Sequence, residues 1–127
     1  MDALTGQVLM SIVIGATIGV FAEFIAHSFK FWIYRKPHYP AINVLFMFGL
    51  LMGLISLAVP TMGWASVFIM ATLIGYGYEK INFSHLHWWD FPNDQFLFFK
   101  GKNACAWAVG FLWGSVPVGA YFVNTVI

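Results

Sequence analysis

Two glutamates occupy matched places in apolar stretches of the chain. Glu23 lies in "GVFAEFIAHSF" and Glu79 in "GYGYEKINFSH", and each follows a glycine by four residues. An ionised acid inside hydrocarbon is costly unless it is paired or protonated. Two carboxylates held close together in a low dielectric retain a proton or share a cation. We therefore predict that Glu23 and Glu79 face one polar site and bind an ion or a substrate there.

Other side chains extend this predicted site. Residues four apart lie on one face of a helix, and a single ridge is therefore formed by Gly15, Gly19, Glu23 and His27. Small residues let another backbone approach closely, so the ridge places Glu23 in a helix contact rather than toward lipid. We add His27 and Asp90 to the predicted ion- or substrate-binding residues.

Metal and nucleophilic chemistry have weaker signals. His27, His85 and His87 are candidate metal ligands, because imidazole nitrogens together with acid oxygens suit first-row metals. The doubled His-x-x-His-His pattern of membrane di-iron hydroxylases is missing, so the metal is left open and no cofactor is predicted. No serine lies in a recognisable Ser–His–acid motif, and we predict no catalytic residue.

The composition indicates where these residues reside. Hydrophobic residues make up 61% of the 127 residues and charged residues only 9%, with a mean hydropathy of +0.79. A soluble domain has roughly a quarter of its residues charged, so most of this surface must face membrane lipid. The net charge of +1 and the lack of a long basic run give no reason to expect nucleic acid as a partner.

Four apolar windows predict the helices of an all-α membrane protein. They fall at Leu9–Phe29, Ile42–Val59, Trp64–Tyr78 and Ala104–Val126, separated by Pro- and Gly-containing breaks. A helix needs about 20 apolar residues to cross the hydrocarbon. We predict one integral membrane domain, residues 1–127, with four transmembrane helices at about 5–34, 41–59, 62–82 and 103–126.

The basic residues predict the orientation. All six lie in the first or third connection: Lys30, Arg35, Lys36, Lys80, Lys100 and Lys102. Basic residues accumulate in short cytoplasmic loops. We therefore place both connections in the cytoplasm and both termini outside, in a membrane that we take to be a bacterial inner membrane.

The two halves of the chain resemble each other. The first and third helices carry Gly-x3-Glu, and the second and fourth carry Gly-x3-Gly, as Gly49 with Gly53 and Gly110 with Gly114. These glycines, like those of the first ridge, favour close helix packing. The pattern predicts two αα hairpins in a parallel repeat, an arrangement found among transporters.

The third connection is too apolar for a solvated loop. It reads "INFSHLHWWDFPNDQFLFF", and Trp favours the headgroup region of a membrane. We predict an interfacial segment in which Trp88, Trp89 and Phe91 contact lipid. A groove for a lipid or another hydrophobic ligand is the alternative for this segment.

The second half also resembles a known family. The resemblance covers about residues 75–115 and rests on Glu79, Trp88, Trp89, Asp90, Phe91, Phe96, Gly101, Cys105, Trp107, Gly110 and Gly114. In the first half only Gly19 and Glu23 match. These positions resemble the family described as ABC-transporter type IV, small polytopic membrane proteins related to an uncharacterised vertebrate transmembrane family. The resemblance implies a membrane protein, and the chain has no Gly-rich phosphate loop for an ATPase of its own.

Three functions remain open from the sequence. The first is an oligomeric transport protein for an ion or a lipid-like substrate, with its site at the cytoplasmic end of the bundle and its path between protomers. The second is a non-catalytic subunit of a larger membrane complex. The third is a membrane enzyme with a metal or acid–base site on the cytoplasmic face. We rank them in this order.

Overall fold

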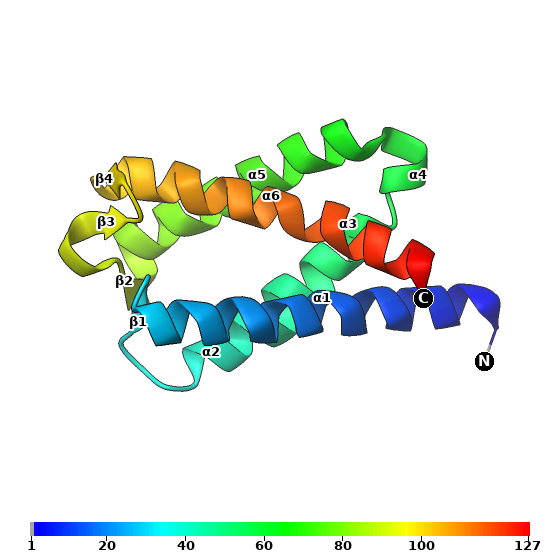
Figure 1. The fold of residues 1–127 in the computed structure, drawn as a ribbon, viewed down its shortest axis with the longest axis horizontal. Helices are drawn as coiled ribbons and strands as arrows, with labels where there is room; N and C mark the ends of the chain where they lie inside the picture. Colours follow the sequence, from blue (N-terminus) through cyan, green and yellow to red (C-terminus); the bar gives the residue numbers. More distant parts are fainter. Residues whose placement is uncertain (1) are drawn as a thin grey trace.

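Four long helical stretches run between the two ends of the molecule (Figure 1). A computed structural model describes residues 2–127 of the chain. The stretches are α1 (Ala3–Phe29); a second helix made of α2 (Tyr39–Ile42), the wide-turned η1 (Asn43–Met52) and α3 (Gly53–Ser56); α5 (Trp64–Ile81), continued by η2 (Asn82–Leu86); and α6 (Lys102–Val126). The short α4 (Val59–Met62) lies between α3 and α5, at the end where both termini lie.

The first helix is shorter than the apolar pattern predicts. Lys30 adopts a left-handed conformation (φ 54°), and the Phe31 N–H bonds back to the Ala26 carbonyl oxygen. α1 therefore ends at Phe29 rather than near residue 34. Apolar Phe31 and Trp32 continue the hydrophobic pattern into a segment that is no longer helical. The other helices begin and end within three residues of the predicted ranges.

Three helices are long and apolar enough to cross a membrane. They are α1, the Tyr39–Ser56 helix and α6, with mean hydropathies of 2.2, 1.8 and 1.4. This is compatible with an all-α integral membrane protein. α5 has 18 residues, but its last turns contain Glu79 and Lys80, which lower its hydropathy. Three candidate spans within residues 2–127 thus stand against the four that the sequence predicts.

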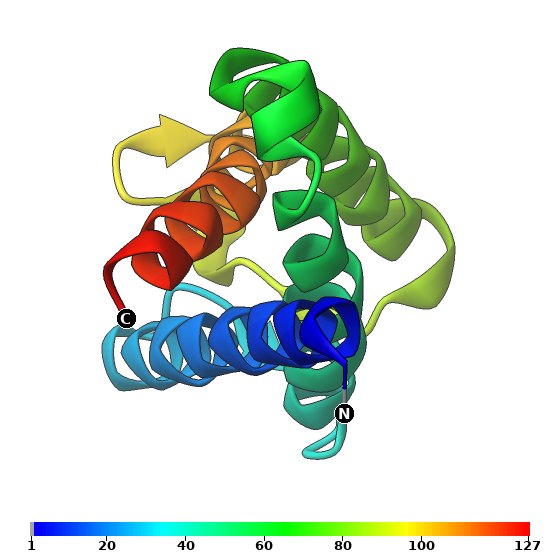
Figure 2. The ribbon, with the colours of Figure 1, turned by 90° about the vertical axis from the view of Figure 1, so that its right-hand side faces the viewer.

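The long helices pack in two pairs (Figure 2), and glycines lie in both contacts. α1 packs along η1 and α3, and α5 packs along α6, in the most extensive contacts of the fold. A Cβ on Gly19 would lie 2.7 Å from the Phe48 side chain, so this contact has no room for a larger residue. A facing helix also lies against the other predicted packing glycines, namely Gly15, Gly49, Gly53, Gly110 and Gly114. Backbones of membrane helices approach closely in this way.

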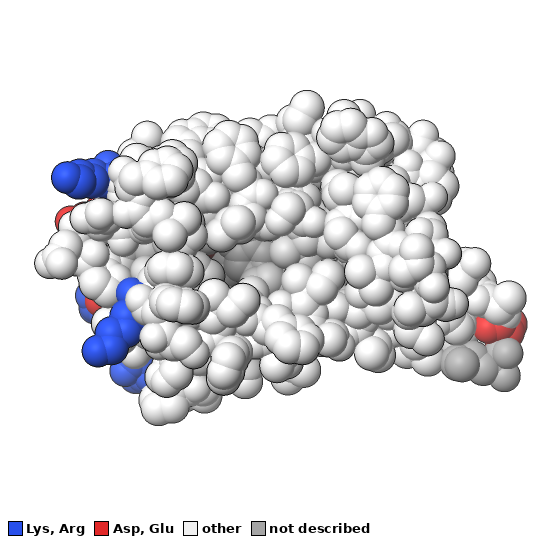
Figure 3. All heavy atoms as spheres, in the orientation of Figure 1, with Lys and Arg blue, Asp and Glu red and all other residues white. Residues whose placement is uncertain are grey.

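The basic side chains gather at the end of the molecule opposite the termini, which we call the basic end (Figure 3). Two short antiparallel strand pairs form there. They are β1 (Ile33–Tyr34) with β2 (Trp89–Asp90), and β3 (Gln95–Phe96) with β4 (Phe99–Lys100), and the 3-10 turn η3 (Pro92–Asp94) precedes β3. The β1–β2 pair joins the connection after α1 to the connection after α5.

The aromatic segment after α5 folds inward. Trp89 and Phe91 are 2% and 4% exposed, and both belong to the hydrophobic core. Trp88 is half-buried and stacks on Tyr39, with 4.7 Å between the ring centroids. The prediction that Trp89 and Phe91 contact lipid was therefore wrong. The physical reason is that Glu79 gives the Trp89 indole a buried hydrogen-bond partner, so the ring does not need the interface.

Candidate functional site: two carboxylates on one cavity

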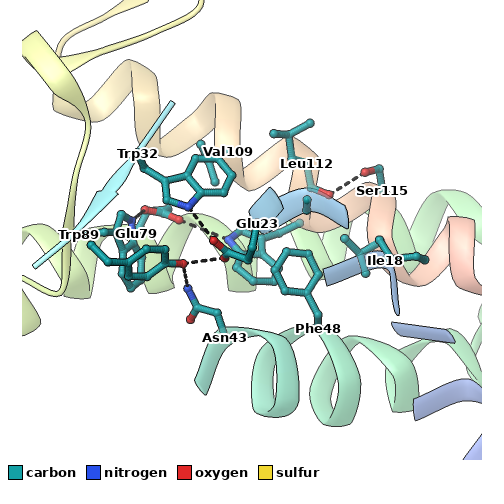
Figure 4. Close-up of a pocket in the computed structure, with 14 residues that line it drawn as sticks. Ile18, Glu23, Trp32, Asn43, Phe48, Glu79, Trp89, Val109, Leu112 and Ser115 are labelled. Atoms are coloured by element: carbon teal, nitrogen blue, oxygen red, sulfur yellow. Dashed lines mark hydrogen bonds between the residues drawn. The ribbon is translucent and has the colours of Figure 1, made fainter. Parts of the chain in front are cut away.

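Glu79 is almost completely buried, with 2% of its surface exposed. Its carboxylate accepts hydrogen bonds from the Trp89 Nε1–H at 2.8 Å and from the Trp113 Nε1–H at 3.4 Å (Figure 4). The adjacent Lys80 is exposed and lies near the Tyr76 ring, so it does not neutralise this acid. No cationic side chain in the described part of the chain forms an ion pair with Glu79. Two indoles therefore hold a carboxylate that lacks a counter-ion among these residues.

Glu23 is half-buried and is held by a different pair of donors. Its carboxylate accepts from the Trp32 Nε1–H at 3.1 Å and from the Tyr34 hydroxyl at 2.6 Å. Trp32 and Tyr34 flank Ile33, and alternate side chains of an extended segment project to the same side. Burial and the nearby carboxylate both raise the pKa of Tyr34 above its ordinary value. The phenol therefore stays protonated and remains a donor to Glu23.

A chain of hydrogen bonds connects Glu23 to the helix that carries Glu79. The Tyr78 hydroxyl on α5 donates to Oδ1 of Asn43, which is buried at the start of η1. The Asn43 amide in turn donates to the Tyr34 hydroxyl, which donates to Glu23. Both the NH2 donor and the carbonyl oxygen of the Asn43 amide are thereby used. The two halves of the molecule thus share one polar network at this depth.

Asn82 positions the Trp89 indole. This fully buried side chain donates to the Trp89 carbonyl oxygen at 2.9 Å. Its own Oδ1 accepts from the backbone N–H groups of Trp88 and Trp89. The amide therefore fixes the turn between η2 and β2, where His87 is left-handed (φ 52°). Without that turn the indole would not reach back to the acid on α5.

One cavity of about 160 Å³ contains both carboxylates (Figure 4). Its wall also includes the rings of Trp32, Tyr34, Phe48, Trp89 and Trp113. Among the described residues that line it there is no Lys, Arg or His. The cavity is thus mainly aromatic and apolar, with two acids and no built-in positive charge from residues 2–127. Such a site favours a cation or a pair of protons.

A second, larger cleft of about 760 Å³ lies at the basic end. Its lining includes the cationic side chains of Lys30 and Arg35. Glu23, Trp32 and Tyr34 line both this cleft and the inner cavity. These three side chains therefore form the partition between the two spaces. Glu79 lines the inner cavity and not the cleft.

The other predicted site residues lie outside the inner cavity. His27 is exposed and lines the cleft. Asp90 is exposed and forms two hydrogen bonds with the Arg35 guanidinium, at 2.9 and 3.2 Å. His85 and His87 are exposed. Within residues 2–127 no three His, Cys, Asp or Glu side chains come close enough to hold a metal ion, so the structure does not bring the candidate metal ligands together.

Several site residues were missed by the sequence analysis. They are Trp32, Tyr34, Asn43, Asn82 and Trp113. Asn43 had a usable signal, because it is a lone amide at the start of the apolar run "VLFMFGLLMG", and polar groups at membrane depth require partners. The aromatic residues had none, since they are common throughout this chain.

Comparisons with known proteins do not assign the chain to a family. No family model, no curated protein and no solved structure matches the chain. The resemblance to the ABC-transporter type IV family therefore stays a prediction.

Proposed function

We propose that this chain is a membrane carrier for cations, which exchanges protons for a cation at Glu23 and Glu79. The observation that carries the proposal is the cavity of about 160 Å³ that holds both carboxylates together with no basic side chain from residues 2–127. Two acids in a low dielectric are stable when their charge is neutralised. Protons neutralise the two carboxylates in one state of the carrier, and a cation together with the remaining proton neutralises them in the other.

The difference between the two acids fits an exchange cycle. Glu23 borders the cleft as well as the cavity, so protons reach it from the basic end. Glu79 lies behind it and contacts only the inner cavity. A proton that leaves one carboxylate makes room for one monovalent cation without a net change of charge. The residues that line the cavity all belong to one copy of the chain. Assembly as a homo-oligomer or within a larger complex stays a prediction.

Our proposal includes four spans arranged as a parallel repeat. Glu23 and Glu79 lie 56 residues apart, as do Gly19 and Gly75. Contacts of two later glycines support the same spacing. Gly49 packs against Ala16, and Gly114 packs against Thr72, which lies 56 residues after Ala16. By these contacts Gly49 corresponds to Gly114. The Gly-x3-Gly motifs instead align Gly49 with Gly110, which lies one helical turn earlier on α6. α5 with η2 provides a fourth helix, Trp64–Leu86, that runs the length of the bundle.

The cation function is tested by transport in sealed vesicles. Purified protein is reconstituted into liposomes with an acidic interior that contains a pH-sensitive dye. External Na⁺, K⁺ or tetramethylammonium is then added. We expect at least one cation to make the interior alkaline. Glu79→Gln and Glu23→Gln should each reduce the initial rate at least tenfold, because Gln keeps the shape of the side chain but carries no charge.

Asp94→Asn is the matched control, because it makes the same change at an exposed acid outside both spaces. Its rate should equal that of the original chain. Equal rates for the two glutamine variants and the original chain, or no exchange with any of the three cations, would overturn the proposal.

The proposed orientation, with the basic end in the cytoplasm, is tested by thiol labelling in cells. Cysteines at Thr61 and Ile127 should react with an impermeant reagent from outside, and one at Asn103 should not. The native Cys105 is buried and serves as the unreactive background. Labelling of the Asn103 variant from outside would reverse the orientation.

A further inference from the structure

The inner cavity opens through the side of the bundle. On α6 it is lined by Leu112, which is 46% exposed, and by the exposed Ser115, and on α1 it is lined by Ile18. Figure 3 shows the corresponding hollow in the surface between α1 and α6. This face carries exposed apolar side chains and lies along two candidate spans. A ligand that enters here comes from the lipid phase.

The route from the basic end is unfavourable for cations. The cleft there carries Lys30 and Arg35, and the Glu23–Trp32–Tyr34 partition separates it from the cavity. Like charges at the entrance repel a positively charged ligand. Protons can still reach Glu23 through water. The lateral opening is therefore the better entrance for a larger cation.

The chemistry of the wall selects between inorganic and organic cations. Hard inorganic cations prefer about six oxygen ligands. Each carboxylate already accepts two hydrogen bonds, and the other polar groups of the wall are also engaged: Tyr34, Asn43 and Ser115. Aromatic rings attract ammonium groups without oxygen ligands. Each indole N–H lies in its ring plane and points at a carboxylate, so ring and acid stand side by side along the wall.

The size of the cavity matches a compact head group. An apolar cavity of about 150 Å³ accommodates a molecule the size of benzene, and this cavity is about 160 Å³. A trimethylammonium group is roughly spherical, thicker than the flat benzene ring but of similar overall diameter. A longer substituent cannot fit beside it, but it can extend through the opening between α1 and α6 into lipid.

From these observations we infer that the ligand is a lipophilic ammonium ion, whose head group occupies the cavity and whose apolar chain passes between α1 and α6. This inference rests on the proposed cation function and names its substrate class. One such ion replaces one proton on the carboxylate pair, so binding releases one proton. No covalent bond changes.

Proton release from purified protein in a neutral detergent tests the substrate class. The probes are hexyltrimethylammonium, tetramethylammonium, Na⁺ and hexanesulfonate, added to a weakly buffered solution with a pH dye. We expect about one proton per bound cation and at least tenfold tighter binding of hexyltrimethylammonium than of tetramethylammonium. Hexanesulfonate has the same chain and the opposite charge, and should release none. Glu79→Gln should abolish the release.

Leu112→Trp tests the lateral opening. The larger ring should fill the opening and weaken hexyltrimethylammonium binding at least fivefold. The matched control is Leu73→Trp on α5, at a position that is also exposed, at 55%, but does not line the cavity. An unchanged affinity in Leu112→Trp, or equal losses in the two variants, would overturn the route.

The outcomes also separate the substrate class from the function. Proton release by Na⁺ that depends on Glu79, without release by either ammonium ion, would overturn the lipophilic ammonium and leave the cation function standing. No release by any cation would overturn both. Release by hexanesulfonate would show that the apolar chain alone drives the signal, which also contradicts the inference.

Discussion

Glu23 and Glu79 occupy corresponding places in the two halves, yet their surroundings differ. Glu79 is 2% exposed and is held by two indoles, one of them on α6. Glu23 is half-buried, and both of its donors come from the connection that follows its own helix. The packed helices therefore fix the surroundings of Glu79, whereas a short non-helical segment fixes those of Glu23. The comparison teaches that similar motifs can place one acid in the packed core and the other beside an open cleft.

The largest expected effect concerns the helix contact behind Glu79. Gly75 lies against the Cβ and ring of Trp113, so Gly75→Val forces two rigid groups into one place. We expect a loss of about 3 kcal/mol or more in the free energy of unfolding. Gly77→Val, two residues along α5, meets nothing within 4 Å and should cost less than about 1 kcal/mol. Denaturant unfolding in detergent measures both, and equal costs would contradict the packing described for this half.

A smaller effect is expected when a hydrogen-bond donor of either acid is removed. Trp89→Phe removes a hydrogen bond from a carboxylate that water does not reach, and should cost about 2 kcal/mol. Trp32→Phe removes the corresponding bond from Glu23, where water in the cleft can replace the donor, and should cost less than about 1 kcal/mol. Thermal unfolding of the two variants gives the order. If Trp32→Phe lowers the stability more than Trp89→Phe, the donors of Glu79 do not hold their carboxylate more firmly than those of Glu23.

The smallest effect lies on the surface beside Glu23. Arg35 and Asp90 form an ion pair in which both side chains are more than half exposed. Exposed pairs contribute about 0–1 kcal/mol, and salt screens them. A double-mutant cycle with Arg35→Ala and Asp90→Ala should therefore give a coupling energy below about 1 kcal/mol that disappears in 1 M salt. A large coupling that resists salt would mean that this pair, rather than Trp32 and Tyr34, organises the region around Glu23.

The sequence was informative about the acids and less so about their partners. Gly-x3-Glu predicts a shared site for Glu23 and Glu79, and both line one cavity in the structure. The pattern relies on local spacing along each helix, which a sequence shows directly. Their donors depend on how distant segments fold back. Tyr34 reaches Glu23 because β1 pairs with β2, some 55 residues later in the chain.

Other errors have similar physical causes. The apolar residues Phe31 and Trp32 extend the helical pattern, but the left-handed Lys30 ends α1 before them. The residue type of Trp89 suits a membrane interface and a buried site equally, because headgroup water and a buried acid can both accept the indole N–H hydrogen bond. Only the position of Glu79 distinguishes the two environments. Such distinctions require the tertiary structure.

The β1–β2 pair has a consequence for the timing of any reaction at Glu23. Tyr34 lies on β1 and Trp32 directly precedes it, so both donors can leave the carboxylate together when β1 separates from β2. The pair consists of Ile33 opposite Asp90 and Tyr34 opposite Trp89, extended by a bond from the Arg35 N–H to the Trp88 carbonyl. Each such bond contributes about 1 kcal/mol, and the two bonds to Glu23 are lost as well, so the separated form is a minor state. Local opening of this kind takes microseconds to seconds, which limits how often Glu23 can lose both donors at once.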